Sequence, residues 1–261
     1  MNAIRVGLLF LRVGIMNDLH YRINFLIQLL QSLIQLGTGL VALWLIFSHT
    51  ATLDGWRPSE LLIVMGVYTM MGGIINALVQ PNMQRLMQEI QDGTFDFALT
   101  KPVDAQMIAS VREVEVWQGV DVVTGLVVTL IAIGHLQTQV GIAQALSFLL
   151  VIALGGTMIY CFWLVLTTAA FWIVKMDQLA DLFQGVYAAG RYPVGVYPAW
   201  LRLGLTFLVP VAFAVTVPSE ALTGRLDWQT LAFAAALCLG FVVFTRFFWR
   251  LGLRRYSGAS A

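Results

Sequence analysis

The sequence predicts an all-α integral membrane protein with six transmembrane helices. Hydrophobic residues make up 59% of its 261 residues and charged residues only 11%, whereas a soluble domain carries about a quarter charged residues. Several segments reach the roughly 20 mostly apolar residues that a spanning helix needs. When these segments are threaded through a bilayer, nearly all Lys and Arg residues fall on one side, as the positive-inside rule requires.

Five spans are clear from hydropathy and length. They cover residues 25–47, 61–79, 116–134, 142–174 and 228–249. Ser59 and Glu60 precede the second span as a helix N-cap and a first-turn acid. The fourth span is longer than a bilayer core requires. We therefore expect it to tilt, to break near Gly155 and Gly156, or to protrude into the cytoplasm.

Residues 177–217 contain the fifth span and allow two topologies. In the first, which hydropathy favours, residues 200–217 cross the membrane. In the second, the fifth helix runs from Asp177 to about Gly195, and residues 200–217 fold back as a shallow re-entrant pair that is broken at Pro210. Both topologies give six crossings, and they differ in the side of the membrane that holds Arg191 and Arg202.

The distribution of basic residues orients the chain. With the N-terminus inside, the first topology leaves all but Arg57 and Arg225 of the 15 Lys and Arg residues in the cytoplasm. The second topology moves Arg191 and Arg202 outward as well. In either case, the positive-inside rule places both termini in the cytoplasm. We expect a multi-pass protein of the inner (plasma) membrane.

Residues 1–22 precede the first span. They mix apolar side chains with Arg5 and Arg12, which share one helical face. An amphipathic helix of this kind lies in the membrane interface, and a frayed leader is the alternative. We expect an interfacial helix along the inner leaflet.

Residues 80–115 form the longest hydrophilic stretch, on the cytoplasmic side. Pro81 is tolerated in the first turn of a helix, and Gly93 is a common C-terminal stop, so we predict a short helix between them. A connection that only joined two spans would need about four to six residues. We therefore expect this loop to bind a partner, with a solvated linker as the alternative.

Polar residues form one stripe along the first span. They are Asn24, Gln28, Gln31, Gln35 and Thr38, and steps of three and four residues place them on one helical face. Amides that face lipid are costly, so the stripe must face protein or a water-lined cavity. Hydrogen bonds between helices and a polar wall of a translocation path both fit, and Asn76 on the second span extends either. Residues 65–73 offer small side chains for close helix packing.

Several other classes of protein lack support. The chain has no G-x-x-x-x-G-K-[ST] motif, and the five clear spans hold no Asp, Glu or Lys near mid-membrane, which argues against an ion-coupled secondary carrier. No cluster of acids, histidines or a Ser/Lys pair indicates a membrane enzyme. A membrane enzyme or scaffold that recruits another cytoplasmic partner stays the main alternative. Cys161 and Cys238 suit packing, the three histidines lack metal-ligand spacing, and a net charge of +1 gives no reason to expect nucleic acid.

Four segments resemble a known family. They are "GTFDFALTKPV", "RYPVGVYPAWLR", "LTFLVPVAFAVTVPSEALTG" and "FFWRLGLRRYSGA". They are similar, in the same order, to segments of the six-span permease subunits of type-2 ABC exporters, known as the ABC-2 family. The resemblance covers nearly the whole chain. It implies a permease that pairs with a second permease, identical or homologous, and is driven by two copies of a separate ATPase subunit.

The resemblance also implies sites and a division of labour. ATP and Mg²⁺ would be held by the ATPase, and no cofactor or metal by this chain. The loop between the second and third spans would form a coupling helix seated on the ATPase, and an outer re-entrant hairpin would cover residues 192–218. On this chain the coupling surface maps to Gln84, Arg85, Gln88, Glu89, Asp92, Gly93, Asp96, Lys101 and Pro102.

Overall fold

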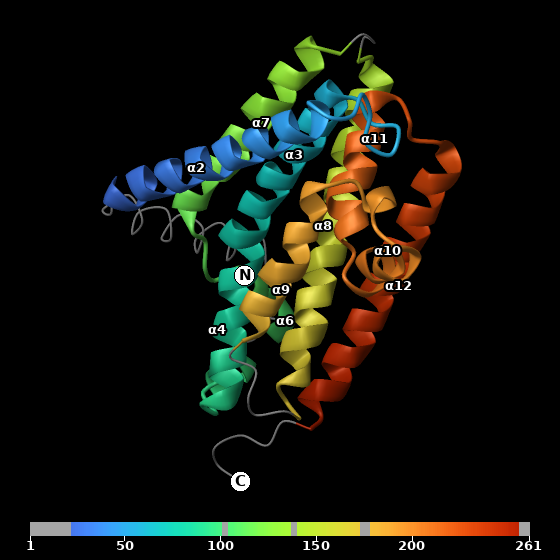
Figure 1. Cartoon of the computed structure of the whole chain (residues 1–261). Coiled ribbons are helices and arrows are strands. Elements are labelled where there is room, and N and C mark those ends of the chain that lie inside the picture. Colours follow the sequence, from blue (N-terminus) through green and yellow to red (C-terminus); the bar gives the residue numbers. More distant parts are fainter. Residues whose placement is uncertain (1–21, 101–103, 137–139, 173–177, 256–261) are drawn as a thin grey trace.

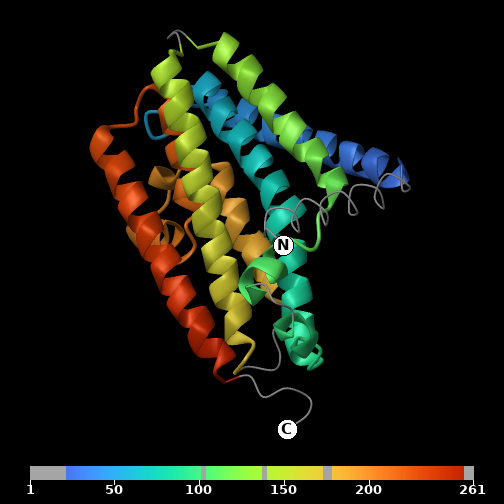
Figure 2. The same cartoon turned by 180° about the vertical axis from the view of Figure 1, so that it is seen from behind.

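The computed structural model describes residues 22–100, 104–136, 140–172 and 178–255, and all regular elements within them are helical (Figures 1 and 2). The long helices are α2 (Arg22–Phe47), α3 (Pro58–Ile74), α7 (Gly119–Gly134), α8 (Ile142–Ala169) and α12 (Trp228–Leu253). The shorter ones are α4 (Gln80–Gln91), α5 (Asp96–Leu99), α6 (Ala105–Ser110), α9 (Leu179–Tyr187), α10 (Ala199–Leu203) and α11 (Val217–Thr223). The chain is thus an all-α membrane protein, with five helices in the described ranges that are long and apolar enough to span a bilayer. The expected interfacial helix at residues 1–22 falls almost wholly outside the described residues.

The second span and the helix that follows it form one continuous helix, Pro58–Gln91, of 34 residues. A π-helical turn, Ile75–Val79, joins α3 to α4. Pro81 has no N–H to donate to the carbonyl of Ala77, four residues earlier. Instead, the backbone N–H of Glu115 donates to that carbonyl at 3.0 Å.

The two ends of α3 correct two sequence expectations. Pro81 was expected to start a separate helix, but a π turn and a hydrogen bond from another segment let the second span continue through it. Ser59 was expected as the N-cap, but the helix already begins at Pro58, and Arg57 occupies the cap position. Glu60 accepts a hydrogen bond from the Arg57 backbone N–H at 2.7 Å, so the first-turn acid does have the expected role.

The centre of the molecule is α3, which packs most closely against α7. A Cβ on Gly125 of α7 would lie 2.4 Å from the backbone nitrogen of Met70, and one on Gly66 of α3 would lie 2.8 Å from the Gly125 carbonyl oxygen. Only glycine permits such an approach of two backbones. The expected close packing of residues 65–73 is therefore found between these two helices.

The first long helix, α2, diverges from the rest of the bundle (Figure 1). In its most apolar window 6% of the residues are buried, against 72% for the helix Pro58–Gln91. Its contacts are with α7 and α3, so one side of the helix meets the protein and the other sides are apolar and open. Such a helix is solvated by lipid or by another membrane chain.

The fourth span, α8, is unbroken from Ile142 to Ala169. Gly155 does not interrupt it, and a Cβ there would lie 2.3 Å from the carbonyl oxygen of Phe213. Gly155 therefore serves the close crossing of α8 with the π-helical turn Ala212–Thr216. Residues 173 and 174, expected to belong to this span, fall outside the described residues.

Residues 179–223 form short helices instead of one straight span. The helical run from α9 ends at Arg191, short of the expected Gly195, because Tyr192 precedes a proline and takes an extended conformation. Further on, Ala199–Leu208 and Ala212–Thr223 meet at a bend of 78°, at the expected break beside Pro210. Counted as one span, this bent pair brings the crossings to six.

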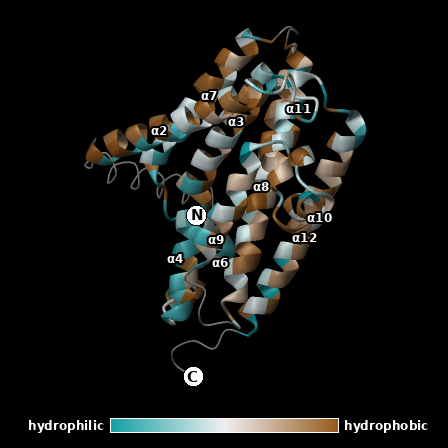
Figure 3. Cartoon of the chain, viewed as in Figure 1, coloured by the Kyte–Doolittle hydropathy of each residue, from teal (hydrophilic) through white to brown (hydrophobic). Residues whose placement is uncertain are grey.

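One end of the molecule is polar. The hydrophilic helix α4 lies there beside the end of α8, with α6 next to it (Figure 3). We call residues 80–100 and 104–118 the polar tip.

Candidate functional site

The polar tip is positioned by the continuous helix that carries it. Its helix α4 ends where the backbone N–H of Asp92 donates to Gln88 at 2.9 Å and that of Thr94 to Glu89 at 2.9 Å. Gly93 lies between them in the left-handed region, with a φ of 69°, which a glycine adopts without strain. The chain therefore turns back sharply at the end of α4.

The helix α4 has two faces. Met83, Leu86, Met87 and Ile90 are buried against the bundle. Gln84, Arg85 and Gln88 lie on the exposed face, and Asp92 is exposed just beyond it. These four residues belong to the expected coupling surface, and the structure brings them together on one side of the tip.

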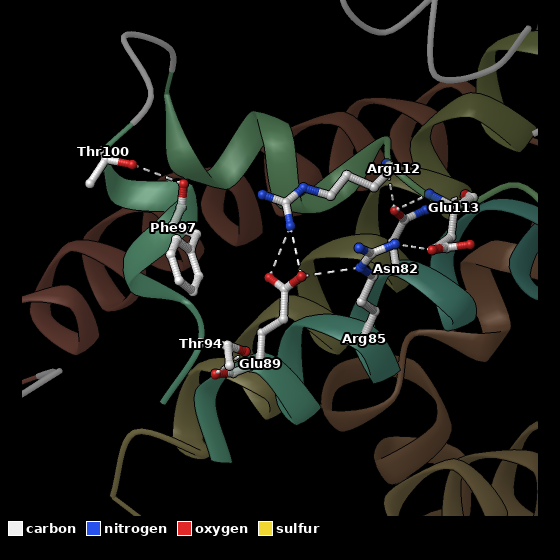
Figure 4. A network of polar contacts seen from close by, with 8 residues as sticks. All are labelled: Asn82, Arg85, Glu89, Thr94, Phe97, Thr100, Arg112 and Glu113. Atoms are coloured by element: carbon white, nitrogen blue, oxygen red, sulfur yellow. Dashed lines mark hydrogen bonds and ion pairs between the residues drawn. The ribbon is translucent and has the colours of Figure 1, made fainter. Parts of the chain in front are cut away.

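Asn82 fixes the returning chain to α4 (Figure 4). Its side-chain nitrogen donates to the carbonyls of Leu78 and Glu113, both at 2.7 Å. Its side-chain oxygen accepts from the backbone N–H groups of Arg112 at 2.8 Å and Glu113 at 2.9 Å. The amide is 1% exposed and its four hydrogen-bonding positions are all used. Asn82 thus fixes the position of the returning backbone segment relative to α4.

Glu89 lies inside an ion-pair network (Figure 4). Arg112 donates from Nη1 to both of its carboxylate oxygens, at 2.7 and 3.0 Å, and Arg85 donates from Nε at 3.1 Å. Arg85 also pairs with Glu113. The side chains of Glu89 and Arg112 are 18% and 10% exposed. The sequence hypothesis groups Glu89 with the contact surface, but its described contacts are internal to the tip.

An aromatic cluster joins the polar tip to two spans. Phe95 is fully buried. Its ring packs edge-on against two aromatic rings, that of Trp249 on α12, with the ring centroids 6.0 Å apart, and that of Phe171 just after α8, with the centroids 6.2 Å apart. Such edge-to-face pairs add about 0.5–1.5 kcal/mol each beyond buried area. Asp96, the first residue of α5, is half-buried beside this cluster.

Polar contacts of α6 reach the same two spans. Ser110 forms a hydrogen bond with the hydroxyl of Tyr160 on α8 at 2.7 Å. Asp104 caps α6 by accepting from the backbone N–H of Gln106 at 3.0 Å, and it pairs with Arg246 of α12. The hydrogen bond from Arg246 lowers the pKa of the Asp104 carboxyl, against the opposing effect of partial burial. The tip is therefore attached to α3, α8 and α12 together.

The exposed surface of the tip includes a residue that the sequence hypothesis missed. Phe97 is 75% exposed, and Leu99 beside it is 41% exposed. An exposed aromatic residue next to the expected contact residues is a candidate anchor for a protein interface. Lys101 and Pro102, also expected in the contact surface, lie outside the described residues.

The polar stripe on α2 divides into three parts. Gln28 donates to Asp121 of α7 at 2.7 Å, which is a hydrogen bond between helices. Gln35 and Thr38 line a small cavity beside α3. Asn24 is half-buried and Gln31 is exposed. The first part suits a helix interface and the second suits a polar cavity.

Asn76 takes part in a separate contact. The side chain of Gln184 on α9 donates to Asn76 at 2.9 Å and to Gln80 at 2.8 Å. Asn76 lies in the π-helical turn, and Gln80 opens α4. These three amides tie α9 to the segment where the second span enters the tip.

A family model described as "ABC-2 family transporter protein" matches residues 33–260. No curated protein and no solved structure matches the chain significantly.

Proposed function

The chain belongs to the ABC-2 family of transporter proteins, and from this premise we propose that it is the permease subunit of an ATP-driven exporter. Two copies of a separate ATPase subunit bind and hydrolyse ATP with Mg²⁺. A second permease, identical or homologous, completes the transport path. The chain itself contributes the membrane-spanning helices and the surface on which the ATPase docks.

The proposed orientation follows from charge. The protein is multi-pass, and with both termini and the polar tip in the cytoplasm, most basic residues lie inside. The polar tip then faces the compartment that holds ATP. We therefore place the protein in the inner (plasma) membrane with the start of α3 on the outer side.

The observation that carries the proposal is the unbroken helix Pro58–Gln91. At a rise of 1.5 Å per residue it is about 50 Å long, so it passes through a bilayer core of about 30 Å and continues into the tip. A displacement of the tip by the ATPase is therefore a displacement of α3. The contacts of Phe95 with Trp249 and of Asp104 with Arg246 pass the same displacement to α12.

Added positive charge at the tip tests the proposal. Gln88→Lys combined with Asp92→Lys changes two exposed residues for which no described contact is lost. We expect this variant to melt like the wild type but to lose co-purification of a Walker-motif ATPase, and to lose ATP hydrolysis that depends on the permease. Rim charges govern association rate and register, and the added charges act by repulsion, so high salt, which screens exposed charges, should partly restore binding.

The matched control places positive charge at the other end of the molecule. Ala51→Lys combined with Thr52→Lys alters exposed residues before α3 and should leave ATPase binding unchanged. Retention of ATPase binding and of ATP-driven transport by the tip variant would contradict the proposal.

A further inference from the structure

We propose that Arg191 recognises an anionic group, a carboxylate or a phosphate, on the transported molecule. This inference rests on the proposed transport function and names the class of substrate. It depends on a small cavity with polar side chains in its wall, on the depth of that cavity in the membrane, and on a guanidinium that donates no described hydrogen bond.

The cavity lies between α2, α3 and the turn that follows α9. Its volume is about 70 Å³, and a water molecule occupies about 30 Å³ in the liquid. It therefore has room for a small ionised group. The side chains that give it polar character are Gln35, Thr38, Tyr68, Thr69, Arg191 and Tyr192.

The depth of the cavity follows from its position along α3. Tyr68 is ten residues from the start of α3 at Pro58, which corresponds to about 15 Å along the helix. With the start of α3 at the outer surface, as in the proposed orientation, and a hydrocarbon core about 30 Å thick, Tyr68 and the cavity beside it lie near the middle of the membrane. An ionisable side chain at this depth is costly and marks a functional site by default.

The guanidinium of Arg191 stacks on an aromatic ring. Its central carbon lies 5.6 Å from the centroid of Tyr68. The Tyr68 ring is itself fixed, because Tyr187 stacks on it at 4.8 Å and donates its hydroxyl to the Tyr68 carbonyl at 2.8 Å. A cation–π contact holds the guanidinium in place without occupying its N–H donors.

No carboxylate neutralises this charge within the described residues. Arg191 takes part in none of the ion pairs found there, and no Asp or Glu is among the residues that line the cavity. A guanidinium binds carboxylate or phosphate through two parallel hydrogen bonds. Gln35, on the α2 wall of the cavity, provides a neutral amide donor for the same anion, whereas the hydroxyl of Thr38 donates to the Gln35 carbonyl at 2.9 Å.

The test measures stabilisation of the full chain in an uncharged detergent, without an ATPase. The melting temperature is followed while dodecyl phosphate, inorganic phosphate or uncharged dodecanol is added, because a ligand that binds the folded state raises it. We expect dodecyl phosphate, but not dodecanol, to stabilise the wild type. Arg191→Gln should weaken the apparent affinity at least tenfold, and Arg191→Lys less, since lysine keeps the charge but not the fork of donors.

Two further variants keep the test decisive. Arg202→Gln removes an exposed basic residue of α10 and should bind dodecyl phosphate like the wild type. Gln35→Leu changes the α2 wall of the cavity, so it should weaken binding even if Arg191→Gln proves unstable without ligand.

The two anions distinguish the source of the ligand. Stabilisation by inorganic phosphate that depends on Arg191 indicates a soluble anion, whereas stabilisation by dodecyl phosphate alone indicates an anionic amphiphile. Equal stabilisation of the wild type and Arg191→Gln, or no stabilisation of the wild type by either anion, would overturn the proposal. Because no ATPase is present, such a result would leave the proposed coupling to an ATPase untouched.

Discussion

At the scale of single residues, Glu89 is the acceptor that holds the polar tip together. Glu89→Ala leaves Arg112, which is 10% exposed, without its carboxylate. Hydrogen bonds to charged groups contribute about 1.5–3 kcal/mol, so we expect a loss of about 2–3 kcal/mol in the free energy of unfolding. Denaturant titration in mixed micelles measures it. Asp92→Ala, which removes an exposed carboxylate at the end of the same helix, should change stability by less than about 0.5 kcal/mol.

Asp104 gives the tip a defined response to acid. The pKa of this carboxyl is lowered in the folded chain, chiefly by the hydrogen bond from Arg246, so its stabilising effect is present above the unfolded pKa and is lost as the pH falls through the folded pKa. We expect the stabilities of the wild type and Asp104→Asn to differ by a constant amount between pH 5 and pH 8. The two curves should converge below about pH 4. A difference that instead grows between pH 5 and pH 8 would contradict this assignment.

The residue scale also shows where sequence reasoning stops. The polar and charged residues of the tip could be predicted, because charge inside an apolar chain is conspicuous. Phe95 and Phe97 could not be told apart from sequence, because they have the same side chain two positions apart. Only the fold shows that Phe95 packs against Trp249 whereas Phe97 is exposed. Glu89 likewise could not be separated from its neighbours without the position of Arg112.

At the scale of elements, the contact between α3 and α7 depends on a glycine. Gly125→Ala places a Cβ 2.4 Å from the Met70 backbone nitrogen, so the two helices must separate. Overpacking typically costs about 1–3 kcal/mol, and we expect a loss at the upper end because the obstacle is backbone. Gly240→Ala in α12 is the control, since its Cβ would meet nothing within 4 Å and alanine favours a helix by about 1 kcal/mol. Unfolding in mixed micelles compares the two.

The long spans could be predicted from length and hydropathy, because an apolar segment of about 20 residues has the length and composition of a membrane-spanning helix. The continuity of the second span with α4 could not be predicted. Proline at position 81 is an ordinary signal for a helix start, and only the carbonyl of Ala77 accepting from Glu115 shows how the helix continues. The bent pair beside Pro210 could be predicted in part. The sequence indicated the break, but it did not indicate the angle between the two helices.

At the scale of the whole molecule, Phe97 is expected to anchor the partner ATPase. Phe97→Ala removes a ring that is 75% exposed, so folding should be unaffected. Truncation of an aromatic anchor in an interface costs about 2 kcal/mol or more, which corresponds to a loss of affinity of at least tenfold. Binding of the purified ATPase to the permease in nanodiscs measures it.

Phe95→Ala provides the contrast for this prediction. Phe95 is fully buried, so its truncation should lower the free energy of unfolding by about 3 kcal/mol or more. If Phe97→Ala bound the ATPase as tightly as the wild type, the exposed edge of the tip would not be the docking surface.

The hydrogen bond between Ala77 and Glu115 also sets an order of events during biosynthesis. While the nascent chain is shorter than 115 residues, the Ala77 carbonyl has no backbone donor at position 81 and none from Glu115. The backbone pairing of the second span is therefore complete only after residue 115 has been synthesised and has packed against Ala77.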